Sequence, residues 1–182
     1  TKPIETRIAD LLGRMTLEDK CRQIDIYHPK SLKISDRAIL NKEFQLLGDT
    51  LSEGIGFLQF DTYLDPENYA ANFNAIQKYF VTETRLGIPA ITNGEGCHGF
   101  VGTGGTVFPV PLSLGSTWDA PLIEEIYAAI AKEMRSYGIT HAATPVLDLL
   151  RDPRYGRCNE LYGEDPYLVG ELGVSAIFGL QG

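Results

Sequence analysis

The sequence is poor in cysteine, in long apolar runs and in positive charge, and each shortage excludes a class of protein. Its three cysteines are widely spaced, with no C-x-x-C or H-E-x-x-H motif, so we expect neither a zinc site nor a disulfide framework. A single bridge between Cys97 and Cys158 stays open. No apolar run approaches the roughly 18 residues of a membrane span. Because 24 acidic residues outnumber 16 basic ones, we expect no binding to nucleic acid. We also expect no membrane partner.

What is present is an ordinary globular composition in a chain of 182 residues, 43% apolar and 22% charged. That length favours one domain, whereas a complete (β/α)₈ barrel usually takes about 250 residues. The chain begins at Thr1 without a methionine or a signal sequence and ends on an apolar stretch. We therefore interpret it as a piece of a longer protein. Its compartment is not stated, with a secreted or periplasmic one slightly favoured.

The pattern divides into leading helices with a surface segment (1–53) and a series of strand–helix units (54–182). Thr16–Asp19 resembles a helix capping box, and residues 28–53 are predicted to be a solvated surface segment. Apolar runs predict strands at 55–60, 88–92 and 139–147. Asp-Pro or Asp-x-Pro starts predict the helices, with core stripes at Tyr69, Phe73, Ile76 and Phe80, and at Leu122, Ile126, Ile130 and Met134. This alternation predicts an α/β fold with a parallel sheet.

Unusual residues follow the second predicted strand, in the stretch Asn93–Gly99, here called the glycine segment. Three glycines within six residues allow a sharp turn and a close approach to a ligand. Glu95 and His98 are its polar side chains, and parallel sheets bind ligands at this end of their strands. A surface or capping pair is the competing interpretation. The nearby glycine loop, 102–106, lacks the G-K-[ST] ending of a phosphate loop, so we expect a structural turn there.

Arginines and acids crowd the stretch Arg151–Glu160 that follows the third predicted strand, here called the arginine segment. The simpler explanation is an ion-pair network that braces a long loop. A guanidinium can also form forked hydrogen bonds to vicinal hydroxyls, and with a carboxylate such as Glu95 this arrangement holds a sugar. Tyr155 could form an aromatic wall for a pyranose face.

Together these segments resemble glycoside hydrolase family 3, the exo-acting β-glycosidases. The matching pieces, in the family's order, are Arg14–Lys20, Ile88-Pro89, Glu95–Gly99, Thr106–Pro109, Thr117–Asp119, Pro145–Leu149 and Asp152–Pro166. Each is weak by itself, but seven in order across the chain are highly specific. The resemblance implies the N-terminal part of a (β/α)₈ TIM-type barrel, ending after about the third or fourth βα unit and completed by the rest of a parent chain.

The resemblance also implies roles for particular residues. Glu95 and Arg157 match positions that bind the hydroxyls of the terminal sugar, whereas His98, Arg154 and Glu160 match supporting positions. Many related β-glucosidases have Asp in place of Glu95. The extra methylene could crowd a C6 hydroxymethyl group, which leans towards xylose. No cofactor and no metal are implied.

The family hydrolyses terminal β-D-glucosyl or β-D-xylosyl residues of oligosaccharides with retention, which requires two carboxyls roughly 5–5.5 Å apart. The segments that carry its nucleophile and its acid/base have no match here, so we expect both beyond residue 182 and no activity from this chain alone. One alternative is a non-catalytic sugar-binding or scaffold half-barrel. Another is a phosphate-binding α/β protein, which the glycine loop's missing lysine disfavours.

Overall fold

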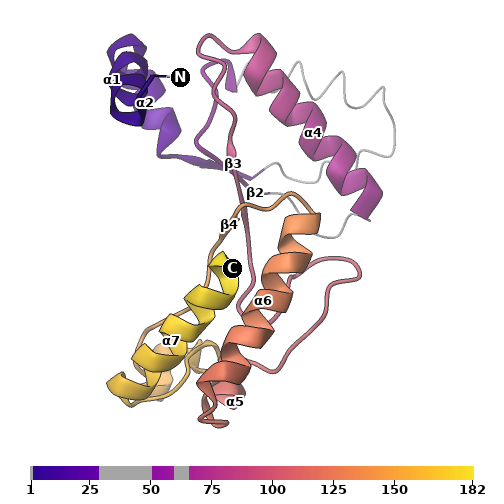
Figure 1. The fold of residues 1–182 in the computed structure, drawn as a ribbon, viewed down its shortest axis with the longest axis vertical. Helices are drawn as coiled ribbons and strands as arrows, with labels where there is room; N and C mark the ends of the chain where they lie inside the picture. The colour runs from indigo at the N-terminus through magenta and orange to yellow at the C-terminus, as the bar shows by residue number, and fades with distance from the viewer. Residues whose placement is uncertain (1, 29–50, 60–65) are drawn as a thin grey trace. The chain divides into compact units, whose positions relative to one another are not determined.

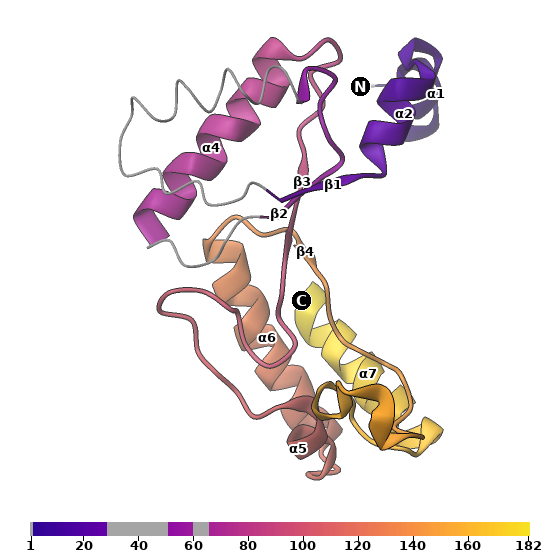
Figure 2. The same cartoon turned by 180° about the vertical axis from the view of Figure 1, so that it is seen from behind.

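A computed structural model describes residues 2–28, 51–59 and 66–182, and their contacts form two compact units. The first unit comprises Thr1–Asp61 and Glu67–Thr92, and the second comprises Thr62–Pro66 and Asn93–Gly182. Figures 1 and 2 show the ribbon from opposite sides. Within the described ranges, no helix is both long and apolar enough to cross a membrane.

The first unit combines helices with two short parallel strands. Its elements include α1 (Ile4–Arg14), α2 (Leu17–Gln23), β1 (Ile26–Tyr27), β2 (Phe57–Gln59) and most of α4 (Pro66–Glu83). The predicted capping box is confirmed, because the Thr16 hydroxyl accepts from Asp19 N at 3.2 Å and the Asp19 carboxylate accepts from Thr16 N at 2.7 Å. Helix α1 has no buried residue, and Ile8 and Leu12 on its apolar face are 46% and 48% exposed.

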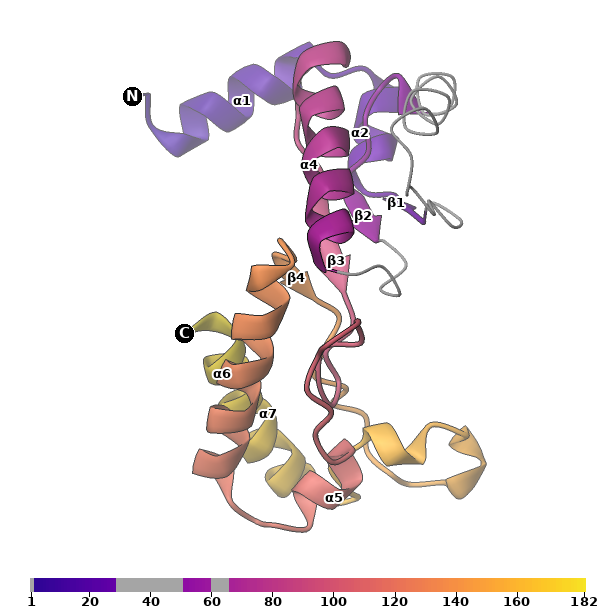
Figure 3. The ribbon, with the colours of Figure 1, turned by 90° about the vertical axis from the view of Figure 1, so that its right-hand side faces the viewer.

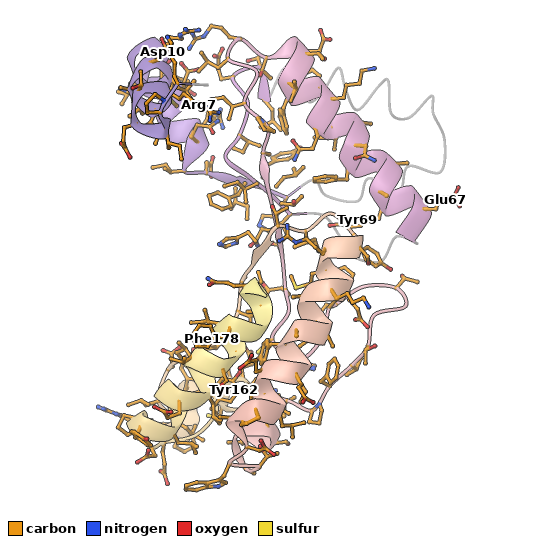
Figure 4. The ribbon with its side chains drawn as sticks, viewed as in Figure 1. Arg7, Asp10, Glu67, Tyr69, Tyr162 and Phe178 are labelled. Atoms are coloured by element: carbon orange, nitrogen blue, oxygen red, sulfur yellow. The ribbon has the colours of Figure 1, made fainter. Side chains whose placement is uncertain are left out.

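Helix α4 carries the stripe that the sequence predicts. Tyr69, Ile76 and Phe80 are buried and Phe73 is half-buried, while Glu67 near the start of the helix is exposed (Figure 4). The strand predicted at 55–60 is shorter, with β2 at its centre, although Ile55 is also buried. Phe60 and most of the predicted surface segment, residues 29–50, lie outside the described residues.

Strands β3 (Ile91–Gly94) and β4 (His141–Ala142) pair in parallel, with Asn93 opposite His141, and the hydrogen-bonded order of the strands is β1-β2-β3-β4. The strand predicted at 88–92 begins three residues later. Both backbone groups of Ala90 are occupied by the Gln77 side chain, at 2.6 and 3.0 Å, so Ala90 does not join the ladder. The strand predicted at 139–147 is also shorter, since β4 covers only His141–Ala142, and Pro145 has no N–H with which to extend the ladder.

The second unit packs two long helices side by side (Figures 1 and 2). Its helices are α5 (Pro111–Gly115), α6 (Ala120–Ser136) and α7 (Pro166–Gln181). Both predicted starts are confirmed, since the side chains of Asp119 and Asp165 accept backbone hydrogen bonds at 3.1 and 2.8 Å. A Cβ on Gly179 of α7 would lie only 2.3 Å from the Glu124 carbonyl of α6, so glycine allows this close contact.

The stripe predicted for α6 is partly wrong. The buried residues are Ile123, Tyr127, Ile130 and Met134, whereas Leu122 is 37% exposed. Spacings of four, three and four keep residues on one face of a helix with 3.6 residues per turn. The predicted spacing of four throughout drifts around the helix by about 40° at each step.

Candidate functional site

The glycine segment begins in the last two residues of β3, and Glu95 directly follows that strand. Glu95 is exposed and His98 is half-buried. The carbonyl of His98 accepts a hydrogen bond from Phe108 N at 2.8 Å, which fixes the end of the segment. The acid therefore faces solvent from a backbone that the neighbouring structure holds in place.

The structure gives the three glycines of this segment a packing role. A Cβ on Gly96 would lie 2.9 Å from Met134 Sδ of α6, and one on Gly94 would lie 2.7 Å from Ile139 Cδ1. Gly99 has a φ of +128°, and its Cβ would lie 2.1 Å from the Thr106 carbonyl oxygen. Gly99 is required because it meets backbone at a positive φ, whereas a side chain on Gly94 or Gly96 would force Ile139 or Met134 to shift.

The arginine segment contains two single 3₁₀ turns, η1 (Pro153–Tyr155) and η2 (Cys158–Glu160), joined through Gly156 at φ +83°. It projects from the side of α5 away from α6 and α7, and η2 contacts α5 (Figure 3). The carboxylate of Asp152 caps η1 by accepting from Arg154 N at 2.9 Å. Tyr155, the predicted aromatic wall, is 45% exposed.

Ion pairs brace this segment, as the simpler interpretation predicts. Arg157 forms a fork with Glu160, with Nε–Oε1 at 2.8 Å and Nη2–Oε2 at 2.5 Å. This hydrogen bonding lowers the pKa of Glu160 and raises that of Arg157. Arg154 pairs with Asp152, with Nη2–Oδ2 at 2.5 Å, and lowers its pKa. Sequence reasoning did not single out Asp152, although an Asp before a proline is a common capping signal.

Charged side chains of the glycine segment and of the arginine segment both act on the Cys97 thiol. Burial and, to a smaller extent, the negative charges of Glu160 and Glu95 raise the pKa of the Cys97 thiol, and Arg157 opposes them, with a net result of about 11. After the larger effects of Arg157 and burial, His98 also lowers the pKa of Glu160. The structure thus brings Glu95, His98, Arg157 and Glu160 into one electrostatic neighbourhood, whereas Arg154 is paired with Asp152.

Two further sequence interpretations can be compared with the structure. All three cysteines are free thiols, so the bridge between Cys97 and Cys158 is not formed. Among the described residues, no group of three or more His, Cys, Asp or Glu side chains is arranged to hold a metal ion. In the glycine loop, Thr106 N and Oγ1 both donate to the Glu133 carboxylate, at 2.9 and 2.5 Å. An acid occupies the donors that a phosphate would need, which agrees with a structural turn.

Comparison with known proteins decides the family. Residues 16–182 match the glycosyl hydrolase family 3 N-terminal domain. The chain belongs to glycoside hydrolase family 3. It is 35% identical over 189 residues to a putative β-xylosidase of Formosa agariphila, covering 98% of this chain and 24% of that protein. It is 30% identical over 188 residues to β-glucosidase C of Emericella nidulans, covering 98% of this chain and 30% of that protein.

Solved structures of the family agree. A mutant β-glucosidase from Listeria innocua in complex with laminaribiose matches with a TM-score of 0.79 and 31% identity, over 100% of this chain and 24% of that one. The predicted α/β fold, part of a family 3 barrel domain, is thereby confirmed. The chain spans 24 to 30% of the length of these relatives.

Proposed function

We propose that the full-length protein containing this chain removes terminal non-reducing β-D-glucosyl or β-D-xylosyl residues with retention. Residues 1–182 would be the N-terminal portion of its barrel domain and supply part of the terminal-sugar pocket. The observation that carries this proposal is the shared electrostatic neighbourhood of Glu95, which directly follows β3, with Arg157 and Glu160, in a family 3 chain. Relatives named β-xylosidase and β-glucosidase support it.

In this proposal, Glu95 accepts hydrogen bonds from sugar hydroxyls, and Arg157 donates to neighbouring ones. A carboxylate and a planar guanidinium suit adjacent hydroxyls because one only accepts and the other only donates. Glu160 holds the Arg157 guanidinium by two hydrogen bonds and so fixes the direction of its remaining N–H groups. His98 and Arg154 support this arrangement from the same two segments.

The bond-breaking groups would come from other parts of the full-length protein. A retaining glycosidase uses one carboxylate as nucleophile and another carboxyl as acid/base. Glu95 acts on hydroxyl groups in this proposal, and Glu160 is committed to Arg157. We therefore assign neither of them a role in cleavage, and we expect the 182-residue chain alone to be inactive.

The test is hydrolysis by the full-length protein of p-nitrophenyl β-D-glucopyranoside and β-D-xylopyranoside, with the anomer of the product followed by proton NMR. We expect turnover with a β-anomer formed first, and the Glu95 methylene leads us to expect a preference for the xyloside. An α-anomer formed first would overturn the retaining mechanism. An inactive full-length protein, together with saturable sugar binding by this chain that Arg157→Ala abolishes, would instead support a non-catalytic sugar-binding domain.

A further inference from the structure

A chain of buried hydroxyl groups connects the glycine segment to Tyr162, which lies two residues after the end of the arginine segment. The Tyr127 hydroxyl on α6 donates to the Cys97 carbonyl of the glycine segment at 2.8 Å, and the Tyr162 hydroxyl donates to Tyr127 at 2.7 Å. The two tyrosines are 0% and 2% exposed. We propose that Tyr127 and Tyr162 are positioning residues that hold the glycine segment and the arginine segment at a fixed separation for sugar binding. This inference rests on the proposed function.

The chemistry of the phenol group fixes which hydroxyl donates and which accepts in this series of hydrogen bonds. A phenol has one proton to donate, and Tyr127 uses its proton on a carbonyl that can only accept. Tyr127 must therefore accept from Tyr162. Burial raises the pKa of both hydroxyls, so both remain protonated donors at ordinary pH.

Each end of this series of hydrogen bonds lies close in the sequence to residues that we propose bind or support binding of the sugar. Cys97 is two residues after Glu95 and directly precedes His98, while Tyr162 is two residues after Glu160. Tyr162 is also fixed through its backbone, since a Cβ on Gly115 of α5 would lie 2.0 Å from the Tyr162 carbonyl oxygen. Tyr127 projects from a long helix whose buried face packs into the core, and it thus provides one rigid reference for both segments.

The two hydroxyls are not equivalent. Replacing Tyr127 by Phe deprives both the Cys97 carbonyl and the Tyr162 hydroxyl of their partner. Replacing Tyr162 by Phe leaves the bond from Tyr127 to Cys97 intact and releases only the second connection. Because a small displacement of substrate-binding groups is costly, Tyr127→Phe should have the larger effect on activity.

Tyr137 offers a matched control. It is also buried, at 8% exposure, and its hydroxyl donates to the carbonyl of Thr103. The loop that it holds, residues 102–106, carries no proposed sugar contact. Tyr137→Phe therefore removes a similar hydrogen bond from a similar environment without reaching the candidate site.

The experiment measures kcat, KM and the unfolding temperature of the full-length protein and of the three Phe variants with the two p-nitrophenyl glycosides. We expect Tyr127→Phe to lower kcat/KM roughly tenfold, mostly through KM, Tyr162→Phe to lower it less, and Tyr137→Phe to change it less than about twofold. Tyr127→Phe and Tyr137→Phe should lower the unfolding temperature by similar amounts.

Equal kcat/KM values for Tyr127→Phe and Tyr137→Phe would overturn the inference and leave the proposed function intact. If Tyr127→Phe fails to fold, the decision falls to Tyr162→Phe, whose kcat/KM must then be lower than that of Tyr137→Phe. A full-length wild type that hydrolyses neither glycoside would overturn the proposed function itself.

Discussion

The glycine segment and the arginine segment both carry residues assigned to the sugar, yet they are held by different means. The glycine segment is fixed from outside, by side chains of α6, by the Thr106 backbone and by the Tyr127 hydrogen bond. The arginine segment is fixed largely from within, by two ion pairs and a side-chain cap on exposed 3₁₀ turns.

This difference separates folding from chemistry. In the glycine segment the backbone is tightly packed and the acid projects outwards, so backbone changes should affect stability. In the arginine segment the side chains are exposed, with 62% of Arg157 and 88% of Arg154 accessible. Changes there should affect sugar binding while leaving the fold nearly unchanged.

The largest effect is expected for Arg157 in the full-length protein. Arg157→Ala should lower kcat/KM by about 10³-fold, because a directed donor to the sugar is lost, whereas Arg154→Ala should cost about tenfold. Arg157→Lys should fall in between, since an ammonium cannot form the fork with Glu160. Steady-state kinetics on both p-nitrophenyl glycosides check this, with thermal unfolding as the control for folding. Equal losses for Arg157→Ala and Arg154→Ala would contradict the assignment.

The next largest effect compares one glycine from each segment. Gly99→Ala should lower the free energy of unfolding by about 3 kcal/mol or more, since it combines a positive φ with a collision against the Thr106 carbonyl. Gly156→Ala has the same kind of backbone, at φ +83°, but open space around it, so about 1 kcal/mol is expected. Urea unfolding measures both. If the two variants lost equal stability, outside packing would not distinguish the segments.

Most of the structural features that were predicted correctly depend on residues that lie close together in the sequence. The Thr16–Asp19 capping box and the caps at Asp119 and Asp165 depend on residues three positions apart, so they are visible in the sequence. The strand starting at 88 was misplaced because the Gln77 side chain, 13 residues from Ala90, occupies the ladder groups of that residue.

The candidate site was predicted in part for the same reason. Glu95 and Arg157 stand out because polar residues follow apolar strands, a pattern within short stretches. Tyr127 and Tyr162 gave no such signal, since their partners are 30 and 35 residues away, and a tyrosine on a helix is ordinary. The packing role of Gly96 also depends on a distant residue, Met134, which only the fold brings close.

The smallest effect concerns the pH dependence of the arginine segment. Hydrogen bonds from Arg157 lower the pKa of Glu160 below its ordinary value of 4.5. The folded state therefore binds this proton less readily than the unfolded state does. The stability from the Arg157–Glu160 pair is fully present above about pH 4.5 and is lost as the pH falls through the lower folded value.

Glu160→Gln should accordingly be slightly less stable than wild type at pH 7, and the two should converge as the pH falls below 4.5. The difference should also shrink in 1 M salt, because the pair is partly exposed. Urea unfolding at several pH values measures it. Gly156→Ala is the matched control, since it lies in the same segment and changes no titrating group, so its offset from wild type should not vary with pH. If the difference in free energy of unfolding between Glu160→Gln and wild type instead widened as the pH fell, Arg157 would not be holding Glu160 as a carboxylate. The arginine segment would then have to be held by contacts from outside, as the glycine segment is.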